Sequence, residues 1–283
     1  MEIVRNRLLE HKGKKPIVYD VFYTPDRRPK PVVIFCHGYK GFKDWGAWNL
    51  VGEHFAAAGF FFLKFNFSHN GGTAENPIDF PDLQAFSENN YSIELDDLAR
   101  VIDFLSGPNP FSEELQPQHI SLIGHSRGGG IVLIKAAEDR RITNVVTWAG
   151  VSDYKSRFNR GTKAFAAWKQ KGVKYIENGR TKQQMPHLFQ FYQDFEDNEK
   201  RLTIERAVRS VRIPQLIVHG AEDPTVPVAE AHALHGWNSQ SSLKIIENAD
   251  HVFNTKHPWE KPVLSPQLQE AVDISISFLK KAQ

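Results

Sequence analysis

The stretch of sequence that decides the fold is HISLIGHSRGGG, residues 119–130. Apolar residues lead into Gly-His-Ser-Arg-Gly, and a predicted helix over residues 128–138 follows it. A strand that passes through Gly-x-Ser-x-Gly into a helix makes a tight turn, because a side chain at either glycine would collide with a neighbouring element. The turn lifts the hydroxyl of Ser126 above the sheet and directs the free N–H groups of the helix N-terminus towards it. We therefore expect Ser126 to be a nucleophile.

Short runs rich in β-branched and aromatic residues predict strands on both sides of this turn. They are residues 17–23, 31–37, 60–67, 119–124, 142–149, 215–219 and 243–247. The middle runs are apolar at consecutive positions, which is typical of parallel strands buried on both faces. Residues 2–9 are expected to form an antiparallel hairpin with the first run, at the edge of the sheet.

Helical patterns alternate with these strands. They cover residues 45–58, 91–105, 128–138, 229–237 and 268–281. This alternation predicts an α/β fold with a doubly wound, mostly parallel sheet.

One segment, residues 151–212, interrupts the alternation. It contains no convincing strand and is rich in Lys, Arg, Gln and aromatic residues. A segment of roughly 60 residues is too long for a plain connection in a compact domain. We expect a mostly helical cap insertion packed over one edge of the sheet, with residues 1–150 and 213–283 forming the core.

A serine hydroxyl needs a base, and His251 is the best candidate. It follows the last predicted strand, residues 243–247, where the chain returns to the same edge of the sheet as the nucleophile. His257 lies further into the same loop, before a proline. His235 falls inside a predicted helix, where a solvated position is expected.

The imidazole in turn needs a carboxylate to fix its tautomer and stabilise its cationic form. Asp223 lies just beyond the strand at 215–219, so nucleophile, acid and base follow one another in the order expected for this turn. Glu222 is a neighbour able to substitute for it. Asp153 and Asp250 are weaker alternatives, and the side chain of Asp250 is expected to point away from the histidine.

An oxyanion hole is the third requirement. One donor is expected to be the backbone N–H of Arg127, directly after the nucleophile. The other is expected to be the backbone N–H of Tyr39, in the loop after the strand at 31–37, where Gly38 permits a sharp turn. His37 is interpreted as a structural residue that bonds to this loop.

Composition excludes several other classes of function. The chain has 35 Lys and Arg against 33 Asp and Glu, a net charge of +2, which argues against nucleic acid or an anionic membrane as partner. The one cysteine, Cys36, excludes an intrachain disulfide. No apolar stretch reaches the ~18–20 residues that span a bilayer, and the N-terminus has no signal-peptide pattern, so a cytoplasmic location is expected.

Together these segments resemble the α/β-hydrolase superfamily. The matching pieces are His37-Gly38, Gly-His-Ser-Arg-Gly at 124–128, Asp-Pro-Thr-Val-Pro at 223–227, and His251. The Asp-Pro-x-Val-Pro segment and the Ser-Arg-Gly-Gly pattern at 126–129 look most similar to the branch of dienelactone-hydrolase-like enzymes, cinnamoyl and feruloyl esterases, and acylaminoacyl-peptidase catalytic domains. Dienelactone hydrolases usually carry a cysteine nucleophile, and serine stands here. The resemblance implies about eight strands, with the cap between the sixth and seventh.

The implied function is hydrolysis of a small-molecule carboxylic ester through an acyl-enzyme, with no cofactor and no metal. Two alternatives stay open at this stage. One is a hydrolase of short or acylated peptides. The other is a non-catalytic binding protein on a hydrolase scaffold, since a fold does not guarantee a function. Oligomeric state and the identity of the acyl group are not encoded in any motif.

Overall fold

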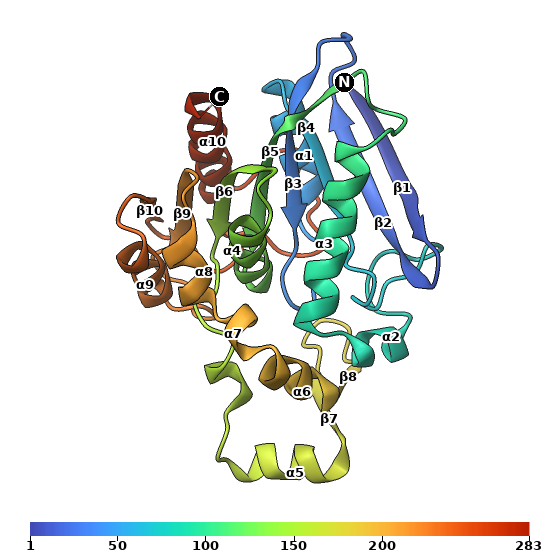
Figure 1. The fold of residues 1–283 in the computed structure, drawn as a ribbon, viewed down its shortest axis with the longest axis vertical. Coiled ribbons are helices and arrows are strands. Elements are labelled where there is room, and N and C mark those ends of the chain that lie inside the picture. Colours follow the sequence, from blue (N-terminus) through green and yellow to red (C-terminus); the bar gives the residue numbers. More distant parts are fainter. Residues whose placement is uncertain (283) are drawn as a thin grey trace.

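An eight-stranded sheet runs through the centre of the computed structural model, which describes residues 1–282 (Figure 1). Its strand order is β1-β2-β4-β3-β5-β6-β9-β10. These strands are β1 (Glu2–His11), β2 (Lys14–Tyr23), β3 (Lys30–Cys36), β4 (Phe61–Phe65), β5 (Leu115–His125), β6 (Ile142–Trp148), β9 (Gln215–Gly220) and β10 (Ser242–Ile246). Pairing is parallel from β4 to β10 and antiparallel for β1 with β2 and β2 with β4. The predicted, mostly parallel sheet with an antiparallel edge hairpin is confirmed.

Helices cover both faces of this sheet. They are α1 (Trp48–Ala57), α3 (Tyr91–Ser106), α4 (Arg127–Glu138), α8 (Ile204–Ser210), α9 (Val228–Trp237) and α10 (Pro266–Lys281). Buried residues of α1 and α10 share one apolar cluster, and those of α3, α4, α8 and α9 share the other. Within β3, Val33 joins the first cluster and Ile34 the second, which explains why the strand is apolar at consecutive positions. The short helix α2 (Leu83–Glu88) was not predicted, because six residues give too little periodicity.

The cap segment contains a β-hairpin, and the prediction that it holds no strand is wrong. Its elements are a 3-10 turn (Ser156–Phe158), α5 (Lys163–Lys171), β7 (Val173–Glu177), β8 (Gln184–Leu188), α6 (Gln190–Asp197) and α7 (Glu199–Leu202). Both strands of the hairpin are edge strands, so they tolerate Pro186 and several charged residues. Five-residue strands of this composition lack the β-branched run on which the prediction depended.

Figure 1 places the cap beyond one end of the sheet, with α5 furthest from it. The cap aromatics Phe158, Trp168, Tyr192 and Phe195 are buried in the same cluster as α3 and α4. Most aromatic residues of the cap therefore hold it on the core. Helix α8, which ends this segment, packs directly against α4.

Three buried charges, Asp20, Lys43 and Lys64, and the partly buried Asp44 tie the loop after β3 to the sheet. Lys43 Nζ lies 2.8 Å from the Asp20 carboxylate and 2.6 Å from that of Asp44. Lys64 Nζ lies 2.8 Å from Asp20 and 2.5 Å from Asp44. Burial, with a smaller effect from Lys43, lowers the pKa of Lys64, and the two carboxylates oppose this effect only in part. Each charge thus depends on the others to offset its lost hydration.

We expect Lys64→Met to destabilise the protein by about 3 kcal/mol, because it leaves the buried Asp20 and the partly buried Asp44 with one ammonium. Urea denaturation at neutral pH measures the change. Lys12→Met, at an exposed position of the β1–β2 turn, is the control and is expected to change the free energy of unfolding by less than about 0.5 kcal/mol. Equal effects of the two substitutions would contradict the importance of the buried cluster.

Candidate active site

The backbone between β5 and α4 turns sharply at Ser126. This residue has φ 55° and ψ −120°, which a non-glycine residue rarely adopts. Its N–H donates to the Trp148 carbonyl at 2.9 Å, and its carbonyl accepts from the Gly129 and Val151 N–H groups. These three main-chain hydrogen bonds hold Ser126 in this conformation although it is strained.

Two glycines allow this turn to pack. A Cβ at Gly124 would lie 2.3 Å from the Gly128 carbonyl oxygen. A Cβ at Gly128 would lie 2.6 Å from the carbonyl oxygens of Cys36 and His37, at the end of β3. Strand β5, helix α4 and the loop after β3 therefore meet in van der Waals contact only if both positions lack a side chain.

Three predicted residues meet at this turn. Ser126 Oγ lies 3.0 Å from His251 Nε2, and His251 Nδ1 lies 2.8 Å from Asp223 Oδ2. A carboxylate only accepts, so Nδ1 of the imidazole carries the proton and Nε2 accepts from the serine hydroxyl. Ser126, His251 and Asp223 thus form one hydrogen-bonded chain, in the geometry that general-base activation of a serine would require.

Asp223 is held in its ionised form. Burial alone would raise its pKa, but hydrogen bonds from His219, His251 and the Val226 N–H outweigh burial and hold the pKa of this carboxyl well below its usual range. Oδ1 accepts from the N–H groups of Thr225 and Val226, at 2.8 Å each. These bonds orient Oδ2 towards the imidazole.

The alternative residues are engaged elsewhere. His257 Nδ1 accepts from the Gly46 N–H at 2.9 Å, and His235 Nδ1 lies 2.8 Å from Ser241 Oγ. Asp153 and Asp250 each accept two backbone N–H groups of their own turns. Glu222 is exposed. None of them contacts Ser126 or His251 by hydrogen bond within the described residues, 1–282.

Two buried histidines position the surrounding loops. His125 Nε2 donates to the His251 carbonyl at 2.9 Å, which anchors the histidine loop from the opposite side of the turn. His37 Nδ1 donates to the Gly38 carbonyl at 2.9 Å, and its Nε2 accepts from the Phe67 N–H. Burial lowers the pKa of His125 to about 3 and that of His37 to about 4, so both imidazoles are neutral at pH 7.

The two backbone donors expected for an oxyanion hole flank Ser126. Arg127 is the first residue of α4, so its N–H has no intrahelical acceptor. A Cβ at Gly38 would lie 2.8 Å from the Cβ of Ser126, so the loop that carries Tyr39 passes directly beside the nucleophile. Over residues 1–282, neither N–H has an acceptor in the protein.

Two cavities meet at Ser126. The first, of about 210 Å³, lies under the cap and has Arg127, Tyr154, Lys174 and Phe191 among its lining residues. The second, of about 160 Å³, lies on the His251 side over Trp45 and Trp48. A molecule held across the nucleophile therefore has room on both sides.

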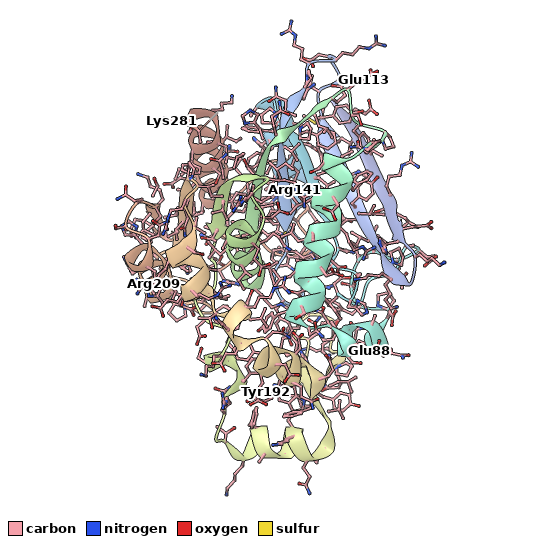
Figure 2. The ribbon with its side chains drawn as sticks, in the orientation of Figure 1. Glu88, Glu113, Arg141, Tyr192, Arg209 and Lys281 are labelled. Atoms are coloured by element: carbon pink, nitrogen blue, oxygen red, sulfur yellow. The ribbon has the colours of Figure 1, made fainter. Side chains whose placement is uncertain are left out.

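Several side-chain contacts around the first cavity were not predicted from the sequence. Arg127 Nη2 lies 2.5 Å from the buried carboxylate of Glu94, and its guanidinium sits 5.0 Å from the Tyr39 ring centroid. The Tyr39 hydroxyl donates to His187 Nε2 at 2.8 Å, joining the loop after β3 to the cap hairpin. The sequence does hold one signal for Glu94, which is a carboxylate on the otherwise apolar face of the predicted helix. Figure 2 shows the density of side chains between α3, α6 and the hairpin.

Comparison with known proteins identifies the family. The profile of the alpha/beta hydrolase fold matches residues 31–204. The chain belongs to this family, and the predicted resemblance is confirmed. Within residues 1–282, no helix has the length and apolar character needed to cross a membrane.

The individual proteins that resemble this chain have low sequence identity to it. A monoacylglycerol lipase of Mycolicibacterium smegmatis is 30% identical over 125 residues, which are 44% of this chain and 39% of that protein. Est1E from Butyrivibrio proteoclasticus has a TM-score of 0.73 at 15% identity, with 98% of each chain covered. Dienelactone hydrolase from Anabaena variabilis has a TM-score of 0.64 at 17% identity, covering 99% of this chain and 97% of that one. The two structural similarities establish the fold.

We expect acid to destabilise the protein through its buried neutral histidines. The pKa of His125 is about 3 when folded, against about 6.5 in an unfolded chain, so the unfolded state binds more protons between these values. The stabilisation is complete above pH ~6.5 and is lost as the pH falls towards the folded pKa, by about 1.4 kcal/mol per pH unit for each such histidine.

Urea denaturation at pH 7, 6 and 5 tests this expectation. His125→Gln keeps a donor for the His251 carbonyl but does not titrate. Unfolding of this variant should therefore take up about one proton fewer, and the slope of the free energy of unfolding against pH should fall accordingly. His11→Gln, at an exposed position, is the matched control. An unchanged slope in His125→Gln would show that His125 is not a buried neutral group.

Proposed function

We propose that the protein is a serine hydrolase that cleaves carboxylic esters through an acyl-enzyme. The observation that carries the proposal is the continuous chain from Ser126 Oγ to His251 Nε2, 3.0 Å, and from His251 Nδ1 to Asp223 Oδ2, 2.8 Å. In this proposal Ser126 attacks the ester carbonyl while His251 takes its proton. Asp223 holds the imidazole in the required tautomer and stabilises its cationic form.

The backbone N–H groups of Tyr39 and Arg127 are proposed to bind the oxyanion of the tetrahedral intermediate. Main-chain donors suit this role because they are already oriented before charge develops, so they stabilise the transition state without reorganisation. The start of α4 adds the positive end of a helix dipole at the same point.

The positions of the two cavities support an assignment of acyl and alcohol sides. His251 lines the second cavity and not the first. The leaving alcohol must take its proton from His251, so it is assigned to the second cavity, over Trp45 and Trp48. The acyl group is then assigned to the first cavity, under the cap. Water activated by His251 completes the cycle by hydrolysing the acyl-enzyme.

Relatives give the proposal general support. One curated relative carries the name monoacylglycerol lipase, and a structure of Est1E, similar to this chain with a TM-score of 0.72 at 17% identity, has ferulic acid bound. Both names concern carboxylic acids and their esters. The two names concern different acyl groups, so they do not specify the acyl group of this chain.

Ser126→Ala is expected to abolish hydrolysis of 4-nitrophenyl esters, with a loss in kcat of about 10⁵-fold or more, and to abolish labelling by a fluorophosphonate probe. Asp223→Asn is expected to lower kcat by about 10⁴-fold, because it permits the wrong tautomer of His251. Folded wild-type protein that neither reacts with the probe nor cleaves any ester would contradict the proposal and favour a binding protein. Turnover of peptides but not of esters would favour the peptidase alternative.

Gly38→Ala tests the oxyanion hole separately from the nucleophile. The added Cβ would lie 2.8 Å from the Ser126 Cβ and displace the loop that carries the Tyr39 N–H, so kcat should fall by about 10²-fold with little change in KM. Gly236→Ala is the control, since a Cβ there meets nothing within 4 Å. Equal kcat values in the two variants would exclude this loop as an oxyanion donor.

A further inference from the structure

The first cavity contains an unbalanced positive charge. Three cationic side chains line it, Arg127, Arg157 and Lys174, and its lining residues include no aspartate or glutamate. Its walls are otherwise largely apolar and aromatic, with Tyr91, Phe158 and Phe191 among the lining side chains. A charge in such surroundings has less hydration than at the open surface.

Both arginines have carboxylate partners behind the cavity wall. Arg127 Nη2 lies 2.5 Å from Glu94 Oε1, and Arg157 Nη2 lies 2.7 Å from Glu230 Oε1. Each guanidinium is thus neutralised within the protein. Neither supplies a net positive charge to a bound molecule.

Lys174 differs from the arginines. Within the described part of the chain, 1–282, no carboxylate lies within 4.0 Å of its ammonium group, and no acceptor hydrogen-bonds to it. Its Nζ instead lies 3.7 Å from the ring centroid of Trp168. A cation–π contact of this kind offsets only part of the lost hydration. Burial accordingly lowers the pKa of Lys174.

The cap hairpin directs Lys174 into the cavity. Lys174 on β7 pairs directly with His187 on β8, so both side chains lie on the same face of the hairpin. Ile176, two residues further along β7, shares this face and also lines the cavity. His187 is committed to the Met185 carbonyl and the Tyr39 hydroxyl, so of the four basic side chains that line the cavity Lys174 is the one with neither a carboxylate partner nor a hydrogen bond among residues 1–282.

We propose that Lys174 determines specificity by binding a carboxylate at the far end of the acyl group. This inference rests on the proposed ester hydrolysis and names its substrate class: half-esters of dicarboxylic acids with an apolar spacer. The spacer lies along the aromatic walls, and the free carboxylate supplies the counter-charge that the cavity lacks. Hydrolysis consumes one water and releases the alcohol and the dicarboxylic acid.

Turnover of matched esters tests the proposal. The wild type is expected to cleave the 4-nitrophenyl half-esters of adipate, suberate or sebacate with kcat/KM on the order of tenfold above the uncharged monocarboxylate esters of equal chain length. Lys174→Met should remove this preference, whereas Lys174→Arg should retain it. Lys169→Met, on the exposed side of α5, is the control for general loss of positive charge on the cap.

Binding provides a second readout that does not need catalysis. In the Ser126→Ala protein, monomethyl suberate should bind on the order of tenfold more tightly than dimethyl suberate, and Lys174→Met should abolish the difference. Calorimetry measures both affinities.

The outcomes separate this inference from the proposed function. Ester turnover that depends on Ser126 but shows no preference altered by Lys174→Met would overturn the role of Lys174 and leave the hydrolase proposal intact. Absence of all turnover, together with carboxylate binding that depends on Lys174, would overturn the hydrolase proposal and retain the anion site. Equal binding of the two suberates in the Ser126→Ala protein would overturn the role of Lys174 independently of turnover.

Discussion

The backbone at Ser126 holds a conformation that an L-residue rarely adopts, and most of the surrounding structure follows from accommodating it. Gly124 and Gly128 permit β5, α4 and the end of β3 to touch, and main-chain bonds to β6 fix the turn from the other side. The parallel strands then deliver Asp223 and His251 to the same edge of the sheet. A single tight turn thus determines which loops are close enough to act together.

The ionisable groups around this turn carry different charges, and the difference favours a cationic His251. Asp223 is ionised, whereas the buried imidazoles of His37 and His125 are neutral. A protonated His125 beside His251 would oppose the imidazolium that forms during general-base catalysis. Because burial keeps His125 neutral, its hydrogen bond to the His251 carbonyl fixes the loop without an electrostatic penalty.

The parts of the fold that were predictable are those that local chemistry determines. Consecutive apolar residues identify strands covered on both faces, and the glycines around Ser126 identify the turn. The hairpin β7–β8 was missed because two edge strands with lysine, glutamine and proline have no characteristic pattern. The pairing of Arg127 with Glu94 and the isolation of Lys174 depend on which distant segments meet, so no local motif encodes them. The catalytic roles of the residues that meet at the turn remain predictions.

Tyr39 belongs to two parts of the molecule at once. Its position beside the nucleophile is set by the main chain at Gly38, while its hydroxyl is tethered to His187 of the cap hairpin. The hairpin that lines the first cavity is thereby connected to the loop beside Ser126. Under the proposed function, a hairpin substitution that reshapes the cavity would also shift this tether, so selectivity and turnover rate would change together.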